Sequence, residues 1–379
     1  MTSDSNTSSP APLSLAESDV ASPSPDRVAL VVGASGITGS ALVDRLAGDG
    51  WRVLALARRE GRPVAGVRWI SADLRSPESL RSALEGQGIS HVFFSAWARQ
   101  ATEEENIAVN GGMVRDLLAA LDSSPVVHAS LVTGLKHYLG PFDAYAQGEM
   151  PDTPFHEEEP RLDTPNFYYA QEDELFAAAE RQTFTWSVHR SHTVIGHAVG
   201  NLMNMGLTLA TYASICKHLG LPFIFPGSET QWNGLTDMTD STVLAEQMVW
   251  AATTPSGANE AFNVVNGDVF RWRWMWPQLA AYFGVEPEGF DTAPRPLEQQ
   301  MIGMESIWAE LAQKHALVEP DLTRLASWWH TDADLGRDIE VVTDISKSRL
   351  AGFHTHHRTV DSFTALFDRY RRDGLIPSA

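Results

Sequence analysis

The chain has 379 residues, and its 28 lysines and arginines against 48 aspartates and glutamates give a formal net charge of −20 at pH 7. A field of that sign excludes nucleic acid and the anionic face of a membrane as favoured partners. Hydrophobic residues make up 43% of the chain, enough for a large core, and the absence of a run of about 18 apolar residues argues against a transmembrane helix. The single cysteine, Cys216, excludes an intrachain disulfide and a cysteine-based zinc site.

Residues 1–26 are rich in Ser, Pro, Asp and Ala, a composition that cannot bury enough apolar surface to offset the entropy of ordering. We therefore expect a disordered tail. This stretch also lacks the basic and apolar regions of a secretory signal. Together with the lone cysteine, this predicts a cytoplasmic protein.

From Arg27 to about residue 190, short apolar segments alternate with helical patterns. This alternation indicates βαβ units and a parallel sheet, so the predicted class is α/β, a Rossmann-type doubly wound sheet in a dinucleotide-binding domain over 27–195. Strands are expected at 28–32, 52–57, 67–70, 91–96, 126–133 and 184–188, and helices at 40–50, 77–85, 103–121 and 166–182.

After residue 195 this rhythm breaks, which predicts a smaller, mixed, substrate-binding lobe over 196–379, with some later segments returning to the sheet. Helices are expected there at 201–220, 237–252, 272–284, 297–315 and 362–372.

A glycine-rich turn, GASGITG, joins the first strand to the first helix. In that context Gly33 permits the tight turn, Gly36 lets the backbone approach a pyrophosphate, and Gly39 lets the helix pack closely on the strand. The helix N-terminus would add N–H groups and a positive dipole end. An ordinary glycine loop is the alternative, but it would not explain the position between strand and helix. The predicted cofactor contacts in this turn are Gly33, Ser35, Gly36, Ile37, Thr38 and Gly39.

The end of the second strand carries Arg58 and Arg59, where an NAD enzyme usually has an acidic residue for the ribose 2′-hydroxyl. Two cations there suit a 2′-phosphate, so NADPH is the predicted cofactor. The alternative, a solvated arginine pair, is stronger for Arg59 than for Arg58. Further cofactor contacts are expected where the later strands end, at Asp73 and Leu74 beside the adenine, at Ser95, Ala96 and Trp97 beside the central ribose, and at Thr133 and Val194.

The common catalytic pattern of short-chain dehydrogenases, Tyr-x-x-x-Lys on one helix, is missing. Four residues after Tyr168 stands Glu172, and four after Tyr169 stands Asp173. A lysine does occur in TGLKHYLGPF, at Lys136, just after the fifth predicted strand. Because ligands of such sheets bind at the carboxyl ends of the strands, Lys136 is expected to reach the same tyrosine from the strand side.

At these residues the chain resembles the progesterone 5β-reductase and iridoid synthase-like family, which are atypical extended short-chain dehydrogenase/reductases. The resemblance covers about residues 28 to 285 and lies in GASGITG, WRVLALARR, HVFFSAWARQ, TGLKHYLGPF, NFYYAQEDEL and FNVVNGDVFRWRWMW. It implies an NADPH-dependent 1,4-reduction of an activated C=C bond in an enone or enal.

The resemblance also implies the catalytic residues. By position in NFYY, it points to Tyr169 as the tyrosine that stabilises the enolate oxygen and to Lys136 as the lysine that assists. Lys136 would lower the pKa of the Tyr169 phenol and anchor the nicotinamide ribose, while Tyr168 is interpreted as a core residue. The family usually reads His-Arg-Pro after the sixth strand, and this chain has Ser191 in place of the proline.

The substrate pocket is expected between the carboxyl edge of the sheet and the lobe, and an apolar, aromatic wall would suit a small apolar carbonyl compound. Its candidate residues are Trp97, Phe142, Met205 and Trp328. No metal site is expected. The run THTHH contains His354, His356 and His357, but zinc would need a third or fourth ligand at suitable geometry, so these are interpreted as surface histidines.

Three other functions stay open at this point. The same tyrosine and lysine would serve an NADPH-dependent reductase of aldehydes or ketones, since they can equally protonate an alkoxide. A non-catalytic, NADP-sensing binding protein is disfavoured by the tyrosine and lysine together. A sugar-nucleotide epimerase is disfavoured by the arginine pair and by the missing Tyr-x-x-x-Lys. A homodimer is also left open.

Overall fold

The structure is a computed structural model that describes residues 27–58, 61, 63–141, 152–201 and 203–378. Its centre is a seven-stranded sheet in the order β10-β6-β5-β4-β1-β2-β3, and every neighbouring pair is parallel. The strands are β1 (Val28–Val32), β2 (Arg52–Ala57), β3 (Val67–Ser71), β4 (His91–Phe94), β5 (His128–Gly134), β6 (Thr185–Ser191) and β10 (Glu260–Val264). The predicted doubly wound α/β fold is confirmed, and its strand order reverses between β1 and β4.

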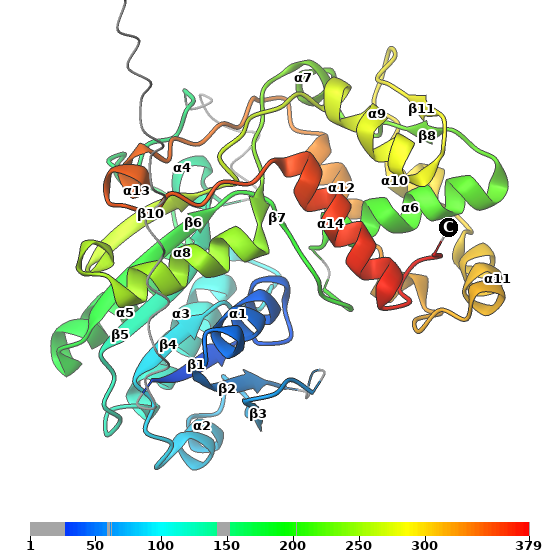
Figure 1. The fold of residues 1–379 in the computed structure, drawn as a ribbon. Helices are drawn as coiled ribbons and strands as arrows, with labels where there is room; N and C mark the ends of the chain where they lie inside the picture. Colours follow the sequence, from blue (N-terminus) through cyan, green and yellow to red (C-terminus); the bar gives the residue numbers. More distant parts are fainter. Residues whose placement is uncertain (1–26, 59–60, 62, 142–151, 202, 379) are drawn as a thin grey trace, which may run out of the picture.

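Helices cover both faces of the sheet, which explains why β1 and β4 are apolar or buried at every position rather than alternating. One face packs on α1 (Ile37–Gly48) and α8 (Ser241–Thr253), and the other packs on α2 (Pro77–Leu84), α3 (Glu103–Ala120) and α5 (Phe167–Gln182). Successive residues of β1 belong to the two different cores, with Leu30 on one face and Val31 on the other. Figure 1 shows this three-layered body below and to the left of the lobe.

The lobe is built around the aromatic residues that are so frequent in the sequence. Its core joins α6 (Met205–Leu219), α9 (Trp272–Phe283), α11 (Glu305–His315), α12 (Trp328–Leu335) and α14 (Thr359–Arg372). Phe223 and Trp276 stack there with ring centroids 4.0 Å apart, and Trp308 is fully buried. Most lobe aromatics therefore stabilise its core. Short elements complete the lobe and the loops: α4 (Lys136–Leu139), β7 (Val194–Ile195), β8 (Phe223–Ile224), α7 (Glu229–Asn233), β9 (Thr239–Asp240), η2 (Pro255–Gly257), β11 (Pro287–Glu288), α10 (Leu297–Gln300), η3 (Leu322–Arg324) and α13 (Ser346–Leu350).

Two of the differences between the predicted and observed helices have a local reason. The helix expected at 297–315 is broken into α10 and α11, because Gly303 takes a φ of +76° in the left-handed region between them. The helix expected from residue 237 begins at Ser241, because the Asp240 carboxylate accepts a hydrogen bond from the Thr242 amide and caps it. As predicted in outline, β10 returns from the later part of the chain to pair with β6; the domain boundary at residue 195 stays a prediction.

Within the described residues, no helix is both long and apolar enough to cross a membrane. Cys216 is buried in α6, where its thiol donates to the carbonyl of Pro222 at 3.4 Å.

Candidate active site

A cavity of about 220 Å³ lies at the carboxyl edge of the sheet, and we call it the edge cavity. It opens where β1, β4, β5 and β6 end, beside the reversal of strand order, which is where doubly wound folds bind their ligands. Its walls come from the glycine turn, the strand ends, α5 and the lobe: Gly36, Ile37, Thr38, Ser95, Ala96, Trp97, Val132, Thr133, Gly134, Leu135, Lys136, Tyr168, Gln171, Ser191, His192, Thr193, Val194, Asn201, Met203, His330, Asp334 and Arg337.

The glycine turn has the geometry that a bound pyrophosphate requires. Gly33 has a φ of +81°, and a Cβ there would lie 3.1 Å from the Ala96 amide nitrogen. A Cβ on Gly39 would lie 2.1 Å from the Gly33 carbonyl oxygen, so the close packing of α1 excludes any larger residue. The α1 N-terminus carries no side-chain cap, which leaves its N–H groups for a ligand. These residues therefore fit a dinucleotide.

A second cavity, of about 610 Å³, adjoins the other side of this turn; we call it the α1 cavity. Arg58, predicted to meet an adenosine 2′-phosphate, lines it together with Ser35 of the glycine turn and Arg324 of the lobe. Arg59 lies outside the described residues. Asp73 and Leu74 follow β3 but line neither of these cavities; the Asp73 carboxylate instead accepts from the Arg75 amide at 3.0 Å.

Lys136 is buried in the wall of the edge cavity, only 7% exposed, and aromatic rings surround its ammonium. The Nζ atom lies 4.6 Å from the ring centroid of Phe167, 5.9 Å from that of Tyr168 and 6.0 Å from that of Trp97. Ring faces stabilise a desolvated cation there and fix its position. Lys136 thus lies in the wall of the edge cavity close to the NFYY segment, while its catalytic role stays a prediction.

Asn166 explains why the lysine and this segment lie together. Its side-chain oxygen accepts from the Tyr168 amide at 3.0 Å and so caps α5. Its side-chain nitrogen donates to the Lys136 carbonyl at 2.7 Å. One buried amide thus holds the start of α5 against the turn that carries Lys136.

The two adjacent tyrosines face different surroundings, and these surroundings are the reverse of the expected ones. Tyr168, interpreted from the sequence as a core residue, lines the edge cavity. A Cβ on Gly134 would lie 3.4 Å from its hydroxyl, which places that oxygen at the end of β5. Tyr169 does not line the edge cavity, because the next residue on a helix points about 100° away.

The Tyr169 hydroxyl is used inside the protein. It donates to the His137 carbonyl at 2.7 Å and accepts from the Leu162 amide at 3.0 Å. The guanidinium of Arg161 lies 4.9 Å from its ring centroid. Burial raises the pKa of Tyr169 above its ordinary value, the opposite of the expected effect of Lys136. Tyr169 therefore ties the 152–165 segment to α4 and α5.

A network of charged groups lines the opposite end of the edge cavity. His192 Nδ1 lies 2.8 Å from the fully buried carboxylate of Asp237, and Arg337 donates to His192 Nε2 at 2.8 Å. Because arginine can only donate, Nε2 accepts from Arg337 and the N–H on Nδ1 donates to Asp237. Arg337 also pairs with Asp334; although burial opposes ionisation, Arg337 holds the pKa of Asp334 below its usual range.

The sequence did not indicate this network, although the position of His192 just after β6 was a usable signal. The predicted aromatic pocket is therefore only partly found. Trp97 lines it, whereas Met205 lies in the lobe core and Trp328 packs against that core, because α6 and α12 turn those side chains inward. Phe142 lies outside the described residues. Ser191, in place of the family's proline, donates to the Thr133 carbonyl at 3.1 Å and links β6 to β5.

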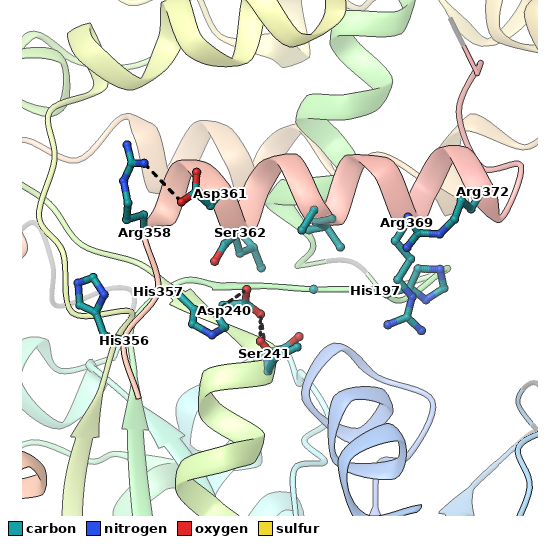
Figure 2. A pocket seen from close by; sticks show the side chains of 15 residues that line it. His197, Asp240, Ser241, His356, His357, Arg358, Asp361, Ser362, Arg369 and Arg372 are labelled. Carbon is teal, nitrogen blue, oxygen red and sulfur yellow. Dashed lines mark hydrogen bonds and ion pairs between the residues drawn. The ribbon is translucent and has the colours of Figure 1, made fainter. Parts of the chain in front are cut away.

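A third cavity, of about 580 Å³, lies between the sheet layers and α14, and we call it the seam cavity. Figure 2 shows α14 lying across it, with His357 directed at Asp240 and Arg358 directed at Asp361. His356 also lines it, and His354 is exposed nearby. Within the part of the chain that the structure describes, no group of three or more His, Cys, Asp or Glu side chains has the geometry to hold a metal ion.

Comparison with known proteins identifies the family of this chain. Residues 81–377 match the model of the PRISE-like Rossmann-fold domain. The chain belongs to this family. A 3-oxo-Δ(4,5)-steroid 5β-reductase from Arabidopsis thaliana is 38% identical over 375 residues, which is 95% of this chain and 96% of the relative. An (S)-8-oxocitronellyl enol synthase from Camptotheca acuminata is 36% identical over 365 residues, covering 92% of this chain and 93% of that protein.

These relatives confirm the predicted resemblance and the predicted class, an oxidoreductase on a Rossmann-type fold. Among solved structures, the UDP-glucose 4-epimerase of Thermus thermophilus in complex with NAD superimposes with a TM-score of 0.63, covering 91% of this chain and 99% of that one at 18% identity. This likeness supports the fold alone.

Proposed function

We propose that this protein is an NADPH-dependent reductase that carries out 1,4-reduction of an activated C=C bond in a small enone or enal. The observation that carries the proposal is the placement of Lys136 and Tyr168 in one cavity beside the glycine turn. The name of the Arabidopsis relative adds support, since a 3-oxo-Δ(4,5)-steroid is a conjugated enone and that protein is named as its reductase.

In this proposal Tyr168, and not Tyr169, meets the substrate. Its hydroxyl, at the end of β5, would donate a hydrogen bond to the carbonyl oxygen as negative charge builds there. The nearby Lys136 ammonium would favour that charge. When bound, NADPH supplies the hydride that is added to the β-carbon. Trp97 and Met203 would contact the apolar part of the substrate.

Arg58 and Ser35 support the choice of NADPH. Both line the α1 cavity on the adenosine side of the glycine turn, where a 2′-phosphate would lie. Gly36, Ile37 and Thr38 face the edge cavity on the other side of the turn, so the pyrophosphate would lie between the two cavities. Location in the cytoplasm and assembly as a homodimer stay predictions.

The test is a substrate panel with purified protein: 2-cyclohexen-1-one, a linear enal, a 3-oxo-4-ene steroid and a saturated aldehyde, each with NADPH and with NADH. We expect NADPH consumption with one or more of the enones and the enal, and a saturated carbonyl as the product. Allylic alcohol as the main product would instead establish 1,2-reduction by a carbonyl reductase. Normal NADPH binding without turnover of any member would overturn the proposal and favour the NADP-sensing alternative.

A further inference from the structure

Gln171 is a buried residue whose side-chain amide forms no hydrogen bonds with the described residues. It lies on α5, three residues after Tyr168, is 1% exposed, and lines the edge cavity. Neither its amide oxygen nor its amide nitrogen has a hydrogen-bond partner among the described residues. A buried amide without hydrogen bonds destabilises the folded protein, and a bound ligand that forms those hydrogen bonds removes this cost.

A comparison with Gln247 shows that this is not the usual state of a buried glutamine in this fold. Gln247 lies on α8 and is also 1% exposed. Its oxygen lies 2.8 Å from His189 Nδ1, and its nitrogen donates to the Asn263 carbonyl at 3.1 Å. The structure therefore satisfies one buried amide completely and leaves the other, at the cavity wall, unsatisfied.

The neighbouring position on α5 shares this property only in part, because Glu172 Oε1 has no hydrogen-bond partner among the described residues whereas Oε2 accepts from Arg161. Glu172 stands four residues after Tyr168, where the commoner dehydrogenases have their lysine. It pairs with Arg161 at 2.8 Å and does not line the edge cavity. The helix thus turns Tyr168 and Gln171 to the cavity and directs Glu172 to Arg161.

We propose that Gln171 binds the ribose hydroxyls on the nicotinamide side of the cofactor, with Thr133 beside it. This rests on the proposed use of NADPH. The glycine turn fixes one end of the edge cavity for the pyrophosphate, and the end of β6 forms another wall. Lys136, Gln171 and Thr133 line the same cavity as Tyr168 and that turn, so a ribose between the pyrophosphate and the nicotinamide would lie within their reach.

The hydrogen-bonding groups of the ribose and of the Gln171 amide are complementary. Each of the two ribose hydroxyls both donates and accepts, and a glutamine amide offers one acceptor and two donors. Thr133 adds a second unsatisfied group to the same wall, because this residue is 2% exposed and its hydroxyl has no partner among the described residues. Gln171 is therefore a binding residue for the cofactor that the Tyr and Lys pattern does not reveal.

The test compares Gln171→Leu and Gln171→Met with Gln247→Leu as the matched control, with binding measured by calorimetry without any substrate. The probes are NADPH, 2′-phospho-ADP-ribose, which keeps the second ribose, and 2′,5′-ADP, which lacks it. Loss of two hydrogen bonds predicts that the Kd of the first two probes rises about tenfold in both Gln171 variants, with no change for 2′,5′-ADP.

Thermal unfolding of the protein without cofactor gives an independent test, because the Tm is not expected to fall when Gln171 is replaced. Gln171→Leu should keep or raise the Tm, because it removes an unsatisfied amide, whereas Gln247→Leu should lower the Tm by about 2 to 4 °C or more. An unchanged NADPH Kd, weaker binding of NADPH but not of 2′-phospho-ADP-ribose, or a large fall in Tm in both Gln171 variants would each overturn the proposal. Wild-type protein that binds NADPH but reduces no enone would overturn the proposed function and leave this inference standing.

Discussion

The edge cavity and the seam cavity differ in how their polar side chains are satisfied. The seam cavity is the larger, about 580 Å³ against 220 Å³, and carries more charge. Its charged groups pair with each other, His357 with Asp240 at 3.5 Å and Arg358 with Asp361 at 3.5 Å. In the edge cavity, Thr133 and Gln171 present polar atoms that have no partner in the described part of the chain. Among the described residues, the Ser362 hydroxyl of the seam cavity also has no hydrogen-bond partner, but only the edge cavity has a buried amide with neither its oxygen nor its nitrogen paired.

The pairs around the seam cavity also join parts that are distant in sequence. Arg369 of α14 lies 3.1 Å from Asp44 of α1, and His357 reaches the residue that caps α8. We therefore infer that the seam cavity contributes to stability and the edge cavity to chemistry. Variants in the two regions should separate these contributions.

The largest effect is expected at Lys136. Lys136→Met keeps the apolar stem but removes the ammonium that favours charge on the substrate oxygen. We expect kcat/KM with the best enone to fall by about 10³-fold, within the range that such groups supply. Lys347→Met is the control, because Lys347 pairs with Glu260 at 2.8 Å and does not line the edge cavity. Retention of more than about a tenth of the activity in Lys136→Met would contradict the assigned role.

The next effect compares the adjacent tyrosines. Tyr168→Phe should lower kcat about 10²-fold with little change in Tm, because its hydroxyl faces the cavity. Tyr169→Phe should keep kcat within a few-fold but lower the Tm, because the Leu162 amide and the buried His137 carbonyl lose a partner. Steady-state kinetics and thermal unfolding of both variants show which tyrosine acts in catalysis and which stabilises the fold. The reverse pattern would restore Tyr169 as the catalytic residue.

This pair also shows how far the sequence carries the prediction. Strand and helix order through β6 follows from apolar runs and glycine positions, and Lys136 is found because strand ends of such sheets bind ligands. The choice between Tyr168 and Tyr169 depends on how far α5 is rotated about its axis. That rotation is set by tertiary contacts, such as the Asn166 bond to the Lys136 carbonyl, and not by the spacing of residues.

The lobe was harder to predict for the same reason. Met205 and Trp328 are large apolar residues, which occur both in cores and in pocket walls. The sequence alone does not distinguish an aromatic-rich core from an aromatic-rich pocket. Gln171 was missed because a polar residue in a helix is ordinarily exposed. Only its burial without partners, which is a property of the packed structure, marks it as a binding residue.

A smaller effect is expected at Arg58. Arg58→Ala should raise the KM for NADPH about tenfold and leave the KM for NADH nearly unchanged, because only NADPH carries a 2′-phosphate. Arg52→Ala is the matched control, since Arg52 is an exposed arginine at the opposite end of the same strand. Equal weakening toward both cofactors would show that Arg58 acts on the fold rather than on the phosphate.

The smallest effect concerns His357 in the seam cavity. Its hydrogen bond with Asp240 raises the pKa of His357. Burial opposes the ionisation of Asp240, but its hydrogen bonds, with that to His357 the largest among them, together hold the pKa of Asp240 below its usual value. A histidine with a raised pKa contributes stability that is complete below its unfolded pKa of about 6.5 and is lost as the pH rises through the folded value. His357→Gln should therefore lower the Tm at pH 5.5 and not at pH 9.

The magnitude should be modest, on the order of 1 °C, because His357 is partly solvent-exposed and water screens the pair. His354→Gln, a change at an exposed histidine of the same loop, is the control and should show no pH-dependent difference from the wild type. Enone reduction by His357→Gln at 25 °C should match the wild type at both pH values. A loss of activity at pH 5.5 without a loss of Tm would mean that the seam cavity influences the chemistry, and would remove the distinction between the two cavities.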